Sequence, residues 1–252
     1  MDAQLLQAAT ENFSLPHDVV PLPSKGIFYK SKKSSVKVGY LTANDENIII
    51  NAATNPNDNL VLTLLRNKLY EHDLRPDELL EGDVEAIMIF LRNTGFGSDY
   101  VVNVEDPKTG KLFEAAISLD ELNIKQTESK PNEEGLFVTK LPKSGTEVKL
   151  KPLSYSEIVE LDRMANEYPV GRVAPKITWR LTKQIVELNG SRDKGVIAKF
   201  VEQMPISDSK HVRNFLRENQ PSLDLKKSVK APSGEIVTID VTFGADFFRP
   251  FF

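Results

Sequence analysis

Side chains that commonly catalyse reactions or bind metals are few in this 252-residue sequence and lie far apart. The three histidines are His17, His72 and His211, and none has the spacing of a zinc-binding H-E-x-x-H helix. The sequence contains no cysteine, which excludes disulfide bonds, thiolate metal ligands and a cysteine nucleophile. We therefore expect no metal site and no cofactor.

Glycine and serine motifs that bind phosphates or activate a nucleophile are incomplete as well. Gly95 and Gly97 lack the third glycine and the preceding strand of a dinucleotide site. The stretch LPSKG at residues 22–26 lacks the residue order of a phosphate-binding loop, and there is no G-x-S-x-G motif. Neighbouring carboxylates such as Asp83 and Glu85 fit solvated or helix-capping positions. We predict a protein with no catalytic residue and no small-molecule substrate, and an enzyme without a recognisable motif is the alternative.

The composition is that of a globular protein, with 40% hydrophobic and 27% charged residues. The net charge of −4 gives no long-range attraction for nucleic acid. No apolar run approaches the roughly 20 residues needed to cross a bilayer, and the first residues do not resemble a signal peptide. We expect a cytosolic protein that binds neither nucleic acid nor membranes.

The strongest pattern in the sequence is an internal repeat. The segment from Asp83 to Leu119 recurs from Asp208 to Phe243, at a shift of 125 residues that falls to 124 after a turn. Both copies begin with apolar residues at i, i+3 and i+4, typical of a helix face. Both continue into two strands joined by a turn that contains Pro and Gly. We interpret the pattern as a duplication.

The repeat extends towards the N-terminus at a smaller shift. LPSKG at 22–26 and LPKSG at 141–145 each precede a strand and a helix, and the two helices stay in register at a shift of 112. Trp179, the only tryptophan, is expected in the core of the second copy. The two helices are each expected to begin at a capping box, Thr42 with Asp45 and Ser154 with Glu157.

The expected fold is therefore α+β, with two tandem homologous units that each contain a β-hairpin, a helical segment and a second β-hairpin. We divide the chain into an N-terminal arm (1–20), a first unit (21–119), a polar linker (120–138) and a second unit with an aromatic C-terminal tail (139–252).

One corner of each unit contains an arginine between two aspartates. Asp83 can cap the helix or lie at the positive end of its dipole. Arg92 lies nine residues further on, about 13 Å along a helix, so Asp99 beyond the chain reversal is its better partner. We predict an ion pair that fixes the helix against the hairpin, with a functional arginine as the alternative. The second unit repeats this set as Asp208, Arg217 and Asp224.

The N-terminal arm contains apolar side chains that can contact a partner. Leu5 and Leu6 would lie on one edge of a short helix that ends before Pro16. The arm is either a docking peptide or a frayed terminus.

The C-terminus contains four phenylalanines in its last six residues. Burying one phenylalanine contributes roughly 1.5–3 kcal/mol, so an apolar tail of this kind must be covered. Phe247 and Phe248 directly follow the last strand, and we expect them in the core of the second unit. Phe251 and Phe252 lie beyond Pro250, and we predict that they bind a partner or a neighbouring copy.

Short motifs in a fixed order resemble one family of proteins. They are LPSKG, V-K-V-x-x-L-T, D-x-E-x-x-x-x-x-L-R, G-F-G-S-x-Y-x-V and, near the end, FFRP. Together they resemble the T4-type baseplate proteins of contractile-tailed bacteriophages, which are hub and hub-assembly proteins, over residues 21–119 and 140–250.

The resemblance implies a structural or assembly role in the virus tail without catalysis. It implies other phage baseplate or tail proteins as partners, and leaves self-association open. It also implies a place in the host cell cytoplasm during virion assembly, with retention in the finished virion left open. A cytosolic adaptor or chaperone that binds a pseudo-symmetric protein partner is the alternative.

Overall fold

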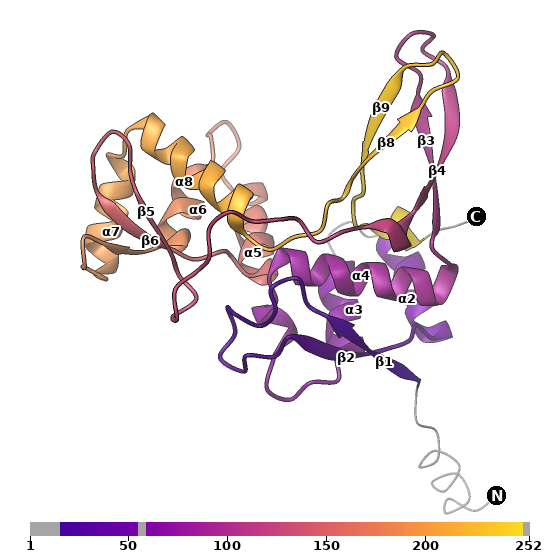
Figure 1. Ribbon diagram of the computed structural model, residues 1–252, viewed down its shortest axis with the longest axis horizontal. Coiled ribbons are helices and arrows are strands. Elements are labelled where there is room, and N and C mark those ends of the chain that lie inside the picture. The colour runs from indigo at the N-terminus through magenta and orange to yellow at the C-terminus, as the bar shows by residue number, and fades with distance from the viewer. Residues whose placement is uncertain (1–15, 55–58, 249–252) are drawn as a thin grey trace, which may run out of the picture.

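The computed structural model describes residues 16–54 and 59–248 (Figure 1). Within these residues the chain is α+β, with seven α-helices and four small antiparallel sheets. Three sheets are two-stranded hairpins and the fourth has three strands in the order β5-β6-β7. No helix among the described residues is long and apolar enough to cross a membrane.

The first half of the chain runs from a hairpin through helices to a second hairpin. Helix α4 is central because its residues Val84, Ile87 and Leu91 recur at helical spacing and are buried. The elements are β1 (His17–Pro21), β2 (Ser35–Gly39), α2 (Ala43–Thr54), α3 (Leu60–Lys68), η1 (Pro76–Glu78), α4 (Glu81–Phe96), β3 (Asp99–Glu105), β4 (Leu112–Ser118) and η2 (Leu119–Glu121).

The second half follows the same order, with one strand and one helix added. The additions are β7, which joins the first hairpin of this half, and α7. The elements are β5 (Phe137–Lys140), β6 (Glu147–Leu150), α5 (Tyr155–Asn166), α6 (Lys176–Gln184), β7 (Ile185–Leu188), α7 (Lys194–Glu202), α8 (Ile206–Asn219), β8 (Lys226–Lys230), β9 (Ile236–Asp240) and η3 (Ala245–Phe248).

Two expected boundaries differ from the structure. Residues 17–20, expected in the arm, form most of β1 and pair with β2. Residues 137 and 138, expected in the linker, begin β5. The capping box of Ser154 and Glu157 is confirmed, with the Glu157 N–H donating to Ser154 Oγ at 3.2 Å and the Ser154 N–H donating to Glu157 Oε2 at 3.0 Å.

Two hydrophobic clusters form the core. The first lies among β1, β2 and the helices α2, α3 and α4, and the second lies among β5, β6, β7 and the helices α6, α7 and α8. The Phe28 side chain packs against both clusters, and its ring lies 5.7 Å from that of Phe137. The two halves are therefore joined by shared apolar contact.

The end of the described chain returns to the first half. Phe247 and Phe248 are buried as expected, but they belong to the first cluster, so their expected place in the core of the second unit is wrong. The Phe247 ring lies 5.4 Å from Tyr100 on β3, and η3 packs against α2 and α4. The chain reaches this position because β8 and β9 leave the second helical cluster and rise beside the first half (Figure 1).

Two hairpins from different halves, β3–β4 and β8–β9, rise side by side from the body (Figure 1). We call these two hairpins the hairpin pair. Covered and exposed side chains alternate along β3, β8 and β9, as expected for strands with one face inward. The two turns are joined at the tip, where Asp106 accepts hydrogen bonds from the Ser233 N–H at 3.0 Å and its hydroxyl at 2.7 Å.

Arg92 fixes the corner between α4 and β3, although by a different contact from the predicted ion pair. The guanidinium is buried and donates to the main-chain oxygens of Gly97 at 2.6 Å and Asp99 at 3.0 Å. The prediction that the Asp99 carboxylate is its partner is wrong. The helix ends at Gly97 with φ of 83°, so the carbonyl groups of the reversal point back towards the arginine.

Arg217 does not repeat this arrangement. Its side chain is exposed and donates to Asn214 Oδ1 at 3.0 Å, and the Asp224 N–H donates instead to the Asn123 carbonyl. The predicted equivalence of the two corners is therefore wrong. The physical reason is that α8 is followed by an extended segment, residues 220–225, that crosses to the first half, so there is no tight corner to fill.

Replacement of Arg92 by Ala is expected to destabilise the protein by about 2–4 kcal/mol, because two hydrogen bonds from a buried, charged guanidinium are lost. Arg217→Ala, at the matching place in the repeat, should leave stability unchanged because that side chain is in water. Chemical denaturation of both variants measures the difference. Equal midpoints for Arg92→Ala and Arg217→Ala would contradict this account of the corner.

Candidate functional site

A buried carboxylate near the start of α4 holds the loop that follows β1. Asp83 is the third residue of α4, and the N-cap is Leu80. The predicted N-cap role of Asp83 is therefore wrong, and Asp83 lies instead at the positive end of the helix dipole, the other predicted position. Asp83 Oδ1 accepts the Ser24 N–H at 2.8 Å, and Oδ2 accepts the Tyr29 hydroxyl. The Leu80 N–H donates to that hydroxyl at 2.9 Å.

The second half contains the same device at Asp208. This residue is the third of α8 and is also buried. Its two oxygens accept the N–H groups of Lys143 at 2.7 Å and Ser144 at 2.9 Å. In each half the bound N–H groups belong to a Leu-Pro turn that ends in a glycine of positive φ, 72° at Gly26 and 69° at Gly145. Positive φ favours glycine there because a side chain would be strained.

The two carboxylates differ in electrostatics. Burial raises the pKa of Asp83, and the hydrogen bonds from Ser24 and Tyr29 offset only part of that effect. Burial alone would also raise the pKa of Asp208, but the hydrogen bonds from Lys143 and Ser144 outweigh it and lower that pKa. Burial and the neighbouring Asp83 raise the pKa of Tyr29. Tyr29 therefore remains a hydrogen-bond donor at neutral pH.

The N-terminal turn of α4 is also where the second half of the chain touches the first. A Cβ atom at Gly82 would lie 2.3 Å from the Pro221 carbonyl oxygen, so glycine is required for this close approach. One turn further, Glu85 Oε2 accepts the Leu223 N–H at 3.1 Å. On the other side, the Tyr155 N–H at the start of α5 donates to the Leu79 carbonyl at 2.8 Å.

Glu85 is a partly buried carboxylate that lies against the crossing segment. Burial raises the pKa of Glu85 from 4.5 to about 7, and the hydrogen bond from Leu223 opposes the rise. Because the nearby charges of Glu81 and Asp83 raise it further, Glu85 stays partly protonated at neutral pH.

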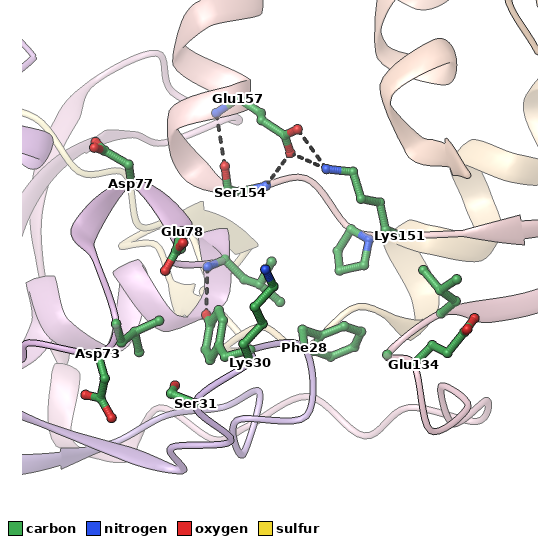
Figure 2. Close-up of a pocket in the computed structure, with 16 residues that line it drawn as sticks. Phe28, Lys30, Ser31, Asp73, Asp77, Glu78, Glu134, Lys151, Ser154 and Glu157 are labelled. Atoms are coloured by element: carbon green, nitrogen blue, oxygen red, sulfur yellow. Dashed lines mark hydrogen bonds and ion pairs between the residues drawn. The ribbon is translucent and has the colours of Figure 1, made fainter. Parts of the chain in front are cut away.

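A cleft of about 490 Å³ opens between the two halves, beside the α4 turn (Figure 2). Apolar side chains that line it include Phe28, Leu80 and Leu136. Five carboxylates also line it, and each is held by a cation, which leaves none of them as an unpaired acid or base. The pairs are Asp73 with Lys33 (2.6 Å), Asp77 with Arg66 (2.9 Å), Glu78 with Arg75 (3.0 Å), Glu134 with Arg192 (2.7 Å) and Glu157 with Lys151 (2.7 Å).

The residues singled out from the sequence fall into separate places. Leu5, Leu6, Phe251 and Phe252 lie outside the described residues. His211 accepts or donates a hydrogen bond with Thr139 at 3.0 Å, and no group of three or more potential metal ligands occurs within the described ranges.

Sequence reasoning missed Tyr29 and Gly82 at the centre of the structure, and its expectation of a solvated or capping position for Glu85 is wrong, because Glu85 is partly buried and binds the Leu223 N–H. Tyr29, Gly82 and Glu85 act on partners 54, about 140 and 138 positions away in sequence, and spacing gives no sign of such contacts. The only available signal was the repeated Leu-Pro turn, which recurs with the aspartate in both halves.

Comparison with known proteins identifies a family for the chain. The family model described as T4 bacteriophage base plate protein matches residues 24–249, which includes both halves. No curated protein and no solved structure matches the chain.

Relative to wild type, the free energy of unfolding of Glu85→Gln is expected to increase as pH rises. A carboxyl group whose pKa is raised by folding contributes most below its unfolded pKa of about 4.5, and that contribution is lost as pH rises through about 7. Relative to wild type, Glu85→Gln should therefore gain about 3 kcal/mol between pH 4.5 and pH 8. Denaturation of both proteins at several pH values measures this gain, and a difference that is constant with pH would show that Glu85 is not desolvated.

Proposed function

Because the chain belongs to the T4 bacteriophage base plate protein family, we propose that it acts in assembly of the baseplate hub, through protein–protein contacts and without catalysis. A structural role in the phage baseplate follows from the family itself. The observation that carries the finer proposal is the extent of the match, residues 24–249. The match includes both helical clusters and the hairpin pair β3–β4 and β8–β9, and is not limited to a single local site.

The arrangement of charges around the cleft supports a role without catalysis. General acid–base catalysis needs a group that is free to exchange a proton with a substrate. The carboxylates of the cleft are held in ion pairs, and Glu157 also caps α5. Asp83 and Asp208 are occupied by backbone N–H groups. Asp83 and Asp208 therefore act as structural groups that bind main-chain N–H groups of the Leu-Pro turns.

We further propose that the chain is a duplication of one α+β unit. The order of hairpin, helices and hairpin in each half supports this, as does the shared contact of an aspartate at the third helical residue with a Leu-Pro turn. With β1 and β5 included, the units run from about residue 17 to 119 and from about residue 137 to 243. The linker is then shorter than 120–138, and the N-terminal arm is shorter than 1–20.

The proposed partners are other baseplate or tail proteins, met in the host cytoplasm while the baseplate is built. Surfaces that are rigid before binding suit such a role, since little conformational freedom is lost on association. A protein that leaves after assembly and one that stays in the virion differ in a simple observable, the presence of this chain in purified particles by mass spectrometry.

A virus in which the gene carries an early stop codon tests the proposal. The expected result is heads and free tail components without baseplates in electron micrographs of infected-cell lysates, with normal particles restored by the wild-type gene on a plasmid. Complementation by Arg217→Ala, an exposed and structurally neutral change, is the matched control. Normal baseplates in the absence of the protein would show that it has no role in hub assembly.

A further inference from the structure

The loop between α5 and α6 exposes apolar side chains on a rigid turn. Val170 and Val173 have 105% and 93% of their surface exposed. The Arg172 N–H donates to the Pro169 carbonyl at 3.1 Å and Gly171 has φ of 83°, the features of a type II turn. Two prolines restrict the loop further, at positions 169 and 175. Exposed valines held in one position favour binding, because little conformational freedom is lost when they are covered.

Aromatic residues support this loop at its base. The Tyr168 and Trp179 rings lie 5.6 Å apart in an edge-to-face arrangement, and both are half-buried, so the expected place of Trp179 in the core is wrong. Trp, Tyr and Arg dominate the energy of protein interfaces. The 168–173 loop contains Tyr168, Arg172 and the two exposed valines, and Trp179 of α6 packs against Tyr168 at its base.

The loop also has uncompensated positive charge. Three carboxylates near the loop already form ion pairs. These are Glu167 with Arg163, Asp162 with Lys176 and Glu160 with Lys183. Among the described residues, no ion pair involves Arg172 or Arg180. The surface therefore attracts a partner with exposed carboxylates, although the whole chain has a net charge of −4.

The exposed face of the β3–β4 hairpin has the opposite character. Leu112 is 72% exposed and Val101 43% exposed. Glu105 lies directly opposite Leu112 in the register, and Glu114 is next along the same face of β4. No ion pair in the described part of the chain involves Glu105 or Glu114, and nearby Lys108 and Lys111 lie in the turn outside both strands.

We propose that the 168–173 loop of one copy binds the exposed face of the β3–β4 hairpin of a second copy. Apolar side chains meet at the centre of this contact, and Arg172 and Arg180 meet Glu105 and Glu114 at its edge. The two surfaces belong to separate parts of one molecule, since the loop lies in the second helical cluster and the hairpin face lies on the hairpin pair (Figure 1). The proposed contact therefore forms between two copies.

Contact between two different surfaces is heterologous, so each copy keeps one free surface and further copies can add. The inference deepens the proposed function by naming a partner and a surface for it. It is tested on the purified protein alone, so its failure would leave the role in the baseplate unaffected.

Sedimentation velocity of the full chain between about 1 µM and 1 mM tests the association. The expected result is a reversible increase in mass with concentration that weakens at high salt, because the charges at the edge are exposed. Val173→Asp and Leu112→Asp should each raise the dissociation constant at least about tenfold. A chain that remains monomeric over the whole range would overturn the proposal.

The matched controls are exposed apolar residues on other surfaces. Ile236→Asp lies on the exposed face of the β8–β9 hairpin at 73% exposure, and Ile206→Asp lies at the start of α8 at 79%. Both variants should associate as wild type does. Loss of association in Ile236→Asp with no loss in Leu112→Asp would place the contact on the other hairpin and contradict the proposal.

A mixing experiment separates this contact from a symmetric one. Val173→Asp retains an intact hairpin face and Leu112→Asp retains an intact loop, so an equal mixture of the two monomeric variants should form a one-to-one dimer. Arg172→Glu combined with Glu114→Arg in one chain should recover association that each change alone reduces. A mixture that stays monomeric would exclude the heterologous contact.

Discussion

A carboxylate taken out of water at the start of a long helix is the constraint on which the rest of the fold depends. Desolvation makes the charged form of Asp83 costly, and the structure offsets part of that cost with one backbone N–H, one tyrosine hydroxyl and the positive end of the α4 dipole. In return the carboxylate fixes the loop after β1 and, through Tyr29, the first turn of α4 itself. The strand, the loop and the helix cannot shift independently without leaving a buried charge unpaired.

The same turn of α4 unites the halves of the chain. Gly82 lets the segment after α8 cross at van der Waals distance, and Glu85 binds its backbone one turn later. The chain then continues into β8 and β9, whose hairpin is tied at its tip to β3–β4 through Asp106, and returns its last phenylalanines to the first cluster. The two halves are therefore interleaved, since the final hairpin of the second half packs beside the hairpin β3–β4 of the first.

The pattern of the sequence predicted local structure well and long-range contacts poorly. The helix at Asp83, the hairpins after it and the capping box at Ser154 follow from periodicity and turn chemistry, which act over a few residues. The partner of Arg92 was mistaken because a guanidinium can bind carbonyl groups as well as a carboxylate, and sequence shows only the carboxylate. The place of Phe247 was mistaken because the crossing of residues 220–225 depends on Gly82 and Glu85, which no spacing marks. The sequence repeat predicts that equivalent segments make equivalent contacts, so it gave no indication that the end of the second half packs in the first cluster.

Native-state hydrogen exchange at the amides of Ser24 and Leu223 tests the central claim most directly, because one reports the Asp83 contact and the other the crossing of the second half over α4. If the α4 turn holds both halves together, the two amides exchange only through global unfolding, with equal free energies that match the free energy of unfolding by denaturant. If Leu223 exchanges through a local opening of much lower free energy while Ser24 stays protected, the second half is held by other contacts and the account is contradicted.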